Sequence, residues 1–421
     1  MNGKDLSKDF IWNTLGSLSY ALSSMLLAMA VIALAGAEEG GIFSFGFSTL
    51  GQQMFIIAYF GIRPFHITDV ENSYSFGEYR RLRIITSAAA ALCAAVYMLF
   101  MSFTGSYTAR KAVIVFIVAL YKIADGAADV YECECQRCGK LYIGGMELFI
   151  RTVLSASSII IGLLVFKNLM AAAVSGVIMQ AVVILVFRHC TENRLFEVGK
   201  TDGNAVKGLF VNTVLLFVSV FLDFYIFSSA KYAVDAQLGN EANSVFTILF
   251  MPANIIYLAA NFVIKPLMTR LADAYAKRDR QQFSRYCIVM EGLIAGLTAA
   301  AMLAVLIIGT PVLTIMEMLM GGRLGGALIA VKNELYLILL GGGIYALSSL
   351  QYYILVILRR QKLIFAVYLV GAAAAFAAAG KAVAAYGMAG GPAVFCALML
   401  FVYLCFRLIS GRILKKEMPR K

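Results

Sequence analysis

One apolar stretch of the chain carries charged side chains at a spacing that brings them together. The segment LYKIADGAADVYECECQRCGK places Lys122, Asp125 and Asp129 at i, i+3 and i+7, on one face of a helix. Arg151 lies one turn into the next apolar run. If the two runs form antiparallel helices, we expect Asp129 to pair with Arg151. Such a group serves either as a structural salt-bridge network or, through Asp125 or Asp129, for proton coupling.

Asp223 is a separate candidate for proton coupling. It lies about 16 residues into an apolar run, roughly 24 Å along a helix at about 1.5 Å per residue. A carboxylate at this depth resists ionisation, so its affinity for a proton would change as its surroundings change. The alternative is a fixed ion pair with Lys231, eight residues further on.

Two basic residues, each followed by proline, indicate a phosphate site. The segment YFGIRPF (59–65) aligns with NFVIKPL (261–267) at an offset of 202, which matches Arg63 with Lys265 and Pro64 with Pro266. We expect each proline to end the regular helix. Basic groups with several N–H donors suit phosphate, and Lys231 adds another base. The alternative is that these side chains only extend to lipid head groups.

Amides and hydroxyls line the helix faces that lead to these bases. Polar groups inside a membrane are costly unless they face protein or water, so we expect a water-filled cavity. Packing by small residues and amide hydrogen bonds is the alternative. The candidates for substrate binding are Asn13, Gln52, Tyr59, Arg63, Asn212, Lys231, Asn254, Asn261 and Lys265, and those for coupling are Asp125, Asp129 and Asp223.

The cysteines argue against a metal centre. Cys133, Cys135 and Cys138 follow a C-x-C-x₂-C spacing, whereas a structural zinc site needs four well-spaced ligands. We expect reduced thiols in a short cytoplasmic turn, in which Gly139 and Gly144-Gly145 break the helix. The sequence contains no hydrolase triad, nucleotide-binding loop or glycosyltransferase site. We therefore expect a protein that is not an enzyme and needs no metal or cofactor.

Membrane-spanning helices must hold these side chains. The chain has 421 residues, of which 61% are hydrophobic, compared with roughly 45–50% in soluble domains. Apolar runs of about 20 residues recur, and 20 helical residues cross a hydrocarbon core of about 30 Å with every backbone group paired. We predict an all-α polytopic protein with twelve spans, at about 10–35, 40–62, 84–103, 112–131, 147–165, 169–187, 208–229, 242–264, 286–308, 334–358, 363–384 and 389–409.

Basic residues orient these spans. With both termini cytoplasmic, the inner segments carry about four times as many Lys and Arg residues as the outer loops, which fits the positive-inside rule. The net charge of +12 then reflects topology and does not indicate a nucleic-acid partner. The first apolar run is too long for a cleaved signal peptide. The remaining charges of the stretch 61–83 are assigned mainly to orientation and loop packing, namely Asp69, Glu71, Glu78, Arg80, Arg81 and Arg83.

The match between the two basic-proline segments also indicates an internal repeat. It relates span 2 to span 8, and WNT (12–14) in span 1 echoes VNT (211–213) in span 7. Chance similarity among apolar helices is the alternative. We predict two parallel six-helix lobes, 1–200 and 201–421, with a substrate site between them.

Three segments resemble a known family. ITDVENSYSFGEYRRLRIIT (67–86), KIADGAADVYECECQ (122–136) and SSAKYAVDAQLGNEA (228–242) resemble Wzx-type polysaccharide flippases of the multidrug/oligosaccharidyl-lipid/polysaccharide (MOP) exporter superfamily. Several members have a glycine-containing turn where this chain has YECECQ. The resemblance implies two lobes in a V around a central cavity. It also implies alternating-access transport, coupled to an ion gradient or membrane potential, of an undecaprenyl pyrophosphate-linked oligosaccharide to the outer leaflet of a bacterial plasma membrane.

Two other functional classes remain open. A MATE-like drug or metabolite antiporter of the same superfamily would favour acids and aromatics in its cavity, whereas this chain offers mainly amides, hydroxyls and bases. A non-transporting scaffold would need no polar faces inside its spans. The expected partners are the lipid-linked oligosaccharide and membrane lipids, with a polysaccharide polymerase and glycosyltransferases as further candidates.

Overall fold

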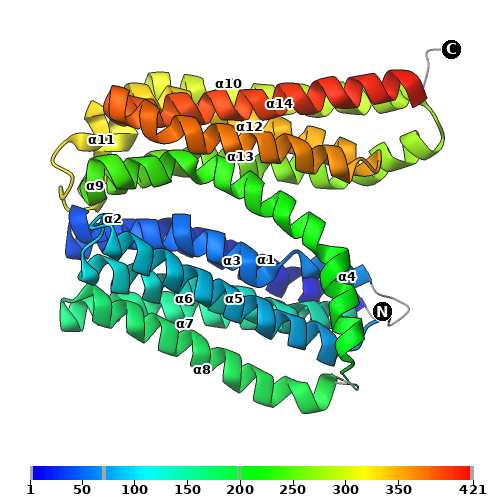
Figure 1. Ribbon diagram of the computed structural model, residues 1–421, viewed down its shortest axis with the longest axis horizontal. Helices are drawn as coiled ribbons and strands as arrows, with labels where there is room; N and C mark the ends of the chain where they lie inside the picture. Colours follow the sequence, from blue (N-terminus) through cyan, green and yellow to red (C-terminus); the bar gives the residue numbers. More distant parts are fainter. Residues whose placement is uncertain (1–2, 69–72, 197–198, 200, 418–421) are drawn as a thin grey trace. The chain divides into compact units, whose positions relative to one another are not determined.

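The structure is a computed structural model that describes residues 3–68, 73–196, 199 and 201–417 (Figure 1). Regular structure in these residues is helical throughout, which confirms the all-α prediction. The helices are α1 (Gly3–Ala35), α2 (Ala37–Phe45), the π-helix η1 (Gly46–Leu50), α3 (Gly51–Tyr59), α4 (Ile62–Thr68), α5 (Phe76–Phe103), α6 (Ala109–Arg137), α7 (Leu141–Phe166), α8 (Leu169–Leu195), α9 (Gly203–Ala276), α10 (Arg280–Leu319), α11 (Ala327–Ala330), α12 (Lys332–Ile357), α13 (Gln361–Tyr386), the 3₁₀-helix η2 (Gly387–Ala389) and α14 (Gly390–Glu417).

The helices are long and apolar enough to cross a membrane repeatedly. Nine such segments lie in the described residues. Two of them, Gly203–Ala260 and Gln361–Glu417, each hold two predicted spans, and α6 holds another predicted span but is richer in charge. Every predicted span thus lies largely within helix. The chain is a multi-pass membrane protein, as predicted.

Contacts group the chain into two compact units, which we call unit 1 (1–221) and unit 2 (222–421). Helix α9 contributes to both units. The predicted lobes, with their boundary at 200/201 and a cavity between them, stay predictions.

Glycines in unit 1 let α7 approach α1 closely. A Cβ atom added to Gly145 would lie 2.6 Å from the backbone nitrogen of Asn13, and one added to Gly16 would lie 2.5 Å from the carbonyl oxygen of Gly145. The expectation that Gly144-Gly145 break the helix is therefore wrong, because these residues lie inside α7 and serve helix packing. The turn itself comes at Gly139, whose φ is +69°.

The predicted span 2 is not one regular helix. The π-helix η1 interrupts it, and Phe60 and Gly61 then adopt left-handed conformations with φ of 52° and 64°. A π-turn adds a residue to one turn and so shifts the helix register at this point. The polar stripe along this span stays a prediction. Gln53 is buried and donates to the carbonyl of Phe221 at 3.1 Å, whereas Gln52 is half-buried.

The two basic-proline segments also differ. Pro64 lies within α4, after the break at Phe60-Gly61. Pro266 lies inside α9, which continues to Ala276 and is interrupted only at Gly239 (φ 83°). The expectation that Pro266 ends its helix is wrong, because membrane helices tolerate a proline when neighbouring groups satisfy the freed carbonyl.

Candidate functional site

A buried charge network in unit 1 is the candidate site, and one face of α6 forms its centre. Lys122, Asp125 and Asp129 are all buried there, as their spacing indicated. The same face continues one turn further to Glu132, which is also buried. The sequence carried this signal, since Glu132 follows Asp129 at i+3.

Arg151 of α7 lies among three carboxylates. Its guanidinium pairs with Asp125, with Glu132 at 2.9 Å and with Glu147 at 2.8 Å. The Nζ of Lys122 lies 3.7 Å from the carboxylate oxygen of Asp125 that Arg151 does not contact. The same Nζ donates to the hydroxyl of Tyr20 at 3.0 Å. The predicted pair of Asp129 with Arg151 is therefore wrong, because Arg151 is held by other acids.

Asp129 binds two arginines from other segments. Arg63 of α4 contacts one carboxylate oxygen at 2.5 Å, and Arg83 of α5 contacts the other at 2.8 Å. Arg83 also donates to the carbonyls of Ala58 (3.0 Å) and Tyr59 (2.5 Å). These carbonyls lie in the last turn of α3, where no following helical N–H satisfies them. Arg83 is only 1% exposed, so its assignment to loop packing is wrong.

The network contains as many acids as bases and is linked throughout. Gln180 of α8 donates to Asp125 at 3.0 Å. Sequence reasoning missed Glu132 although its spacing from Asp129 indicated it. It missed Glu147 and Gln180 because their significance depends on which helices are neighbours. The acidic and basic members are Asp125, Asp129, Glu132 and Glu147 with Arg63, Arg83, Lys122 and Arg151.

Arg63 lies at the edge of this network. Its side chain is 30% exposed, compared with 2% for Arg83. Besides Asp129 it contacts Glu132 at 3.5 Å and Gln136 at 3.3 Å. A guanidinium has five N–H donors, so Arg63 is oriented by protein contacts and still offers donors to a ligand.

A second polar group lies beside Arg63 at the end of α6. His66 Nε2 lies 2.7 Å from Glu134, and the His66 ring stacks on Tyr79 with centroids 4.0 Å apart. Burial lowers the pKa of His66 against the opposing effect of Glu134. Burial alone would raise the pKa of Glu134, but hydrogen bonds from His66 and Arg137 outweigh it and lower this pKa. The pair is thus a neutral imidazole donating to a carboxylate.

Unit 2 holds its polar groups differently. Asp223 is half-buried and accepts a hydrogen bond from Tyr345 at 3.0 Å, with Tyr368 as a further donor. Lys231 is 2% exposed, and its Nζ lies 5.0 Å from the ring centroid of Phe250 and 5.9 Å from that of Phe227. The alternative of an Asp223–Lys231 pair is therefore wrong. Within the described residues, no carboxylate forms an ion pair with Lys231.

The remaining candidates are spread over several helices. Asn13, Asn212 and Asn254 are exposed, and Asn212 donates to the hydroxyl of Tyr74 at 3.3 Å. Tyr59 is half-buried beside Arg83. The side chains of Asn261 and Lys265 lie outside the described part of the structure. Binding and coupling roles for all of these residues stay predictions.

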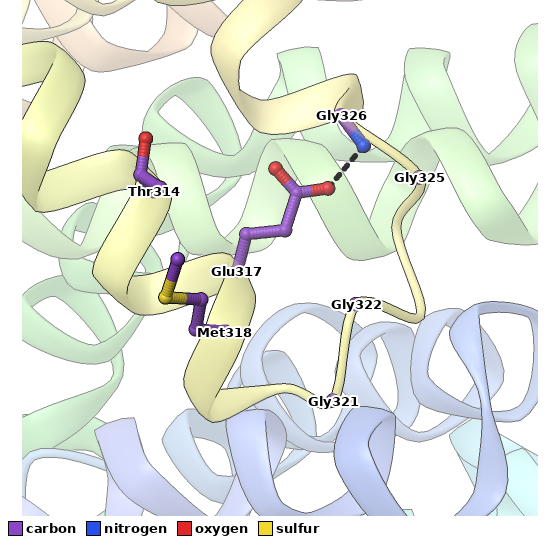
Figure 2. Close-up of a pocket in the computed structure, with 7 residues that line it drawn as sticks. All are labelled: Thr314, Glu317, Met318, Gly321, Gly322, Gly325 and Gly326. Carbon is purple, nitrogen blue, oxygen red and sulfur yellow. Dashed lines mark hydrogen bonds between the residues drawn. The ribbon is translucent and has the colours of Figure 1, made fainter.

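The cysteines and one surface pocket are two further features of the described residues. Cys133 is buried and its thiol lies 3.4 Å from Asp129, and no group of metal-ligating side chains occurs in the part of the chain that the structure describes. Figure 2 shows a pocket of about 470 Å³ at the end of α10, where Glu317 accepts a hydrogen bond from the backbone N–H of Gly326. Glu317 thus fixes the glycine-rich loop, and none of the predicted site residues lines the pocket.

Comparison with known proteins identifies solved structures that share this architecture. No family model and no curated protein matches the sequence. Among solved structures, the multidrug transporter DinF-BH superposes with a TM-score of 0.68 at 11% identity, over 100% of this chain and 98% of that one. An inward-facing MATE transporter of the MOP superfamily gives a TM-score of 0.66 at 11% identity, over 96% of this chain and 98% of that one. The chain has the fold of MOP-superfamily transporters.

Other MOP-fold structures show similar coverage. The bent form of the Vibrio cholerae MATE transporter VcmN gives a TM-score of 0.60 at 15% identity, over 98% of this chain and 97% of that one. A MOP-superfamily transporter from Pyrococcus furiosus, in which the reverse polarity of the binding pocket suggests a different function, gives a TM-score of 0.50 at 13% identity, over 99% of this chain and 95% of that one. At identities this low, the structural similarity establishes the fold of the present chain. Its substrate must be argued from its own residues.

Proposed function

We propose that this MOP-fold protein flips an undecaprenyl pyrophosphate-linked oligosaccharide from the cytoplasmic to the outer leaflet of a bacterial plasma membrane. Transport proceeds by alternating access, coupled to an ion gradient or to membrane potential, with both termini cytoplasmic. The transporter fold and the resemblance of three segments to Wzx-type flippases support this proposal. The physical task fits as well, because sugars and pyrophosphate cannot cross hydrocarbon without polar groups that replace water.

The observation that carries the proposal is the position of Arg63. Its guanidinium is held by Asp129 at 2.5 Å yet remains 30% exposed at the edge of the network. A fixed arginine loses less conformational freedom on binding phosphate than a mobile one. The 3.5 Å contact with Glu132 is the longest that Arg63 makes, so an incoming phosphate would displace this carboxylate first.

The other predicted residues have assigned tasks in this proposal. Lys265, the repeat partner of Arg63, provides a second charge for the pyrophosphate, and Lys231 a further one. The amides and the phenol bind sugar hydroxyls, and Asp125, Asp129 and Asp223 are the candidates for coupling. The sugar-binding candidates are Asn13, Gln52, Tyr59, Asn212, Asn254 and Asn261.

Charge reversal at the two bases tests the proposal. Arg63→Glu and Lys265→Glu should each block export and leave lipid-linked oligosaccharide in the inner leaflet, whereas Lys265→Arg should be tolerated. Arg80→Glu, in the first turns of α5, should have a mild effect. The measurement is surface polysaccharide in a strain lacking its own transporter, with membrane abundance checked by immunoblot. Full export by the double mutant at normal abundance would contradict the proposal.

A second candidate, an antiporter of organic cations, rests on the surroundings of Asp223. Hydroxyls of Tyr345 and Tyr368 donate to its carboxylate, and the ring of Tyr257 lies 4.8 Å from that of Tyr345. A carboxylate among aromatic rings suits an organic cation. Cation efflux from loaded vesicles that Asp223→Asn abolishes, without any change in polysaccharide export, would favour the antiporter. Loss of export alone would favour the flippase.

A further inference from the structure

A groove in unit 2 combines an apolar wall with a basic rim. It encloses about 240 Å³ and lies between the start of α10, the end of α12 and the end of α14. These ends belong to loops that the positive-inside analysis assigns to one side of the membrane, the cytoplasmic side. None of the residues proposed for oligosaccharide transport lines this groove.

The lower part of the groove is apolar. Phe283 and Ile354 are buried in its floor, and Leu414 completes it. Ile288 lines the same groove and is 64% exposed, so the apolar wall continues onto the outer surface of α10. In a membrane protein that surface faces lipid chains, so the apolar wall offers a place for an acyl chain beside the groove.

Bases form the rim, and one of them is firmly fixed. Arg407 donates to Glu291 at 2.7 Å, the same carboxylate oxygen accepts from Gln351 at 2.9 Å, and Ser410 donates to Gln351 at 2.8 Å. Glu291 offsets the charge of Arg407. Arg280 and Lys415 add further positive charge to the rim.

We infer that this groove binds a phospholipid with an anionic head group. The phosphate would lie at the basic rim, and an acyl chain would lie along the wall formed by Ile288. Basic pockets between transmembrane helices on the cytoplasmic side attract such head groups, because that leaflet carries negative surface charge. Free phosphate would use only the rim, whereas a phospholipid uses both the rim and the wall.

Gly411 provides a steric test of the wall. It lies in the groove, and a Cβ atom added there would meet no atom within 4 Å. A leucine at this position would therefore extend into the groove and leave every charge in place. Gly292 of α10 is also open to a larger side chain but does not line the groove, so Gly292→Leu is the matched control.

Lys415 and Lys416 provide a matched test of the rim. Both are exposed in the last turn of α14, but only Lys415 lines the groove. The experiment measures phosphatidylglycerol retained by the purified protein by native mass spectrometry, with phosphatidylcholine and inorganic phosphate as competitors. Lys415→Gln should lower retention about fivefold, the factor expected for one basic residue near an anionic surface, and Lys416→Gln should leave it unchanged.

The expected result is preferential retention of phosphatidylglycerol that falls in both Lys415→Gln and Gly411→Leu and persists in both controls. Equal losses in Lys415→Gln and Lys416→Gln would overturn the inference, because they would indicate general surface charge. Displacement by inorganic phosphate as easily as by lipid, or unchanged retention in Gly411→Leu, would overturn it as well, since the wall would then have no role. Polysaccharide export is a separate measurement, so failure here leaves the proposed function untouched.

Discussion

Unit 1 buries Lys122, Arg83 and Arg151 among carboxylates, whereas unit 2 buries Lys231 against two phenylalanine rings. In unit 1 each ionised group depends on an oppositely charged neighbour, so the loss of one member leaves another buried without compensation. In unit 2, tyrosine hydroxyls instead of a base donate hydrogen bonds to the carboxylate of Asp223. Charge removal should therefore have opposite consequences in the two units.

The largest expected effect is that of Arg151→Met. This substitution leaves Asp125, Glu132 and Glu147 without their shared arginine, and we expect unfolding to become easier by about 3–5 kcal/mol. Thermal unfolding of the purified protein and its membrane abundance are the measurements. Arg110→Met is the control, since the pair of Arg110 with Glu39 is exposed and worth about 1 kcal/mol or less. Equal stability of the two variants would remove the contrast between buried and exposed pairs.

Arg83→Met should have the next largest effect. It removes the contact with Asp129 and the hydrogen bond to the carbonyl of Tyr59, and leaves the carbonyl of Ala58 with the hydroxyl of Thr86 as its donor, at a cost of about 2–4 kcal/mol. The neighbouring Arg81 is exposed, so Arg81→Met should change stability by about 0.5 kcal/mol or less. The stability of both variants is measured by thermal unfolding of the purified protein. A drop in Arg81→Met as large as that in Arg83→Met would restore the assignment of Arg83 to loop packing.

A pH effect should follow from unit 1. The pKa of His66 is lowered by burial from its ordinary value of 6.5, so the unfolded chain takes up a proton there before the folded chain does. Stability should be full above about pH 6.5 and decline as the pH falls below it. The lowered pKa of Glu134 acts in the same direction at lower pH, below its ordinary value of 4.5. Comparison of thermal unfolding between pH 5 and 7 should show a shallower decline in His66→Gln than in wild type, whereas parallel curves would contradict the assignment.

Lys231→Met should have the smallest effect on stability. The substitution removes a buried ammonium that has no ionised partner in the described part of unit 2, so we expect a change within about 1 kcal/mol or a gain. Thermal unfolding compared with Arg151→Met gives the contrast directly. A loss comparable to that of Arg151→Met would show that Lys231 is held by an essential interaction, and the difference between the units would disappear.

Local patterns were enough to predict the helices and one face of the site. Apolar runs of sufficient length predict membrane helices because lipid forces each backbone group to pair within its own segment. The spacing of Lys122, Asp125 and Asp129 placed them on one face for the same local reason, the period of the helix. Gly139 was predicted as a turn, and its positive φ agrees.

The pairing of charges was decided by tertiary structure alone. Asp129 lies 66 residues from Arg63 and 46 from Arg83, and the sequence contains no signal for which of its many bases meets a given acid. The left-handed Phe60 and Gly61 end a helix that the sequence pattern continued, and so expose the carbonyls to which Arg83 donates. Helix periodicity is fixed by neighbours a few residues apart, whereas an ion pair depends on how whole helices pack, and this packing determined the candidate site.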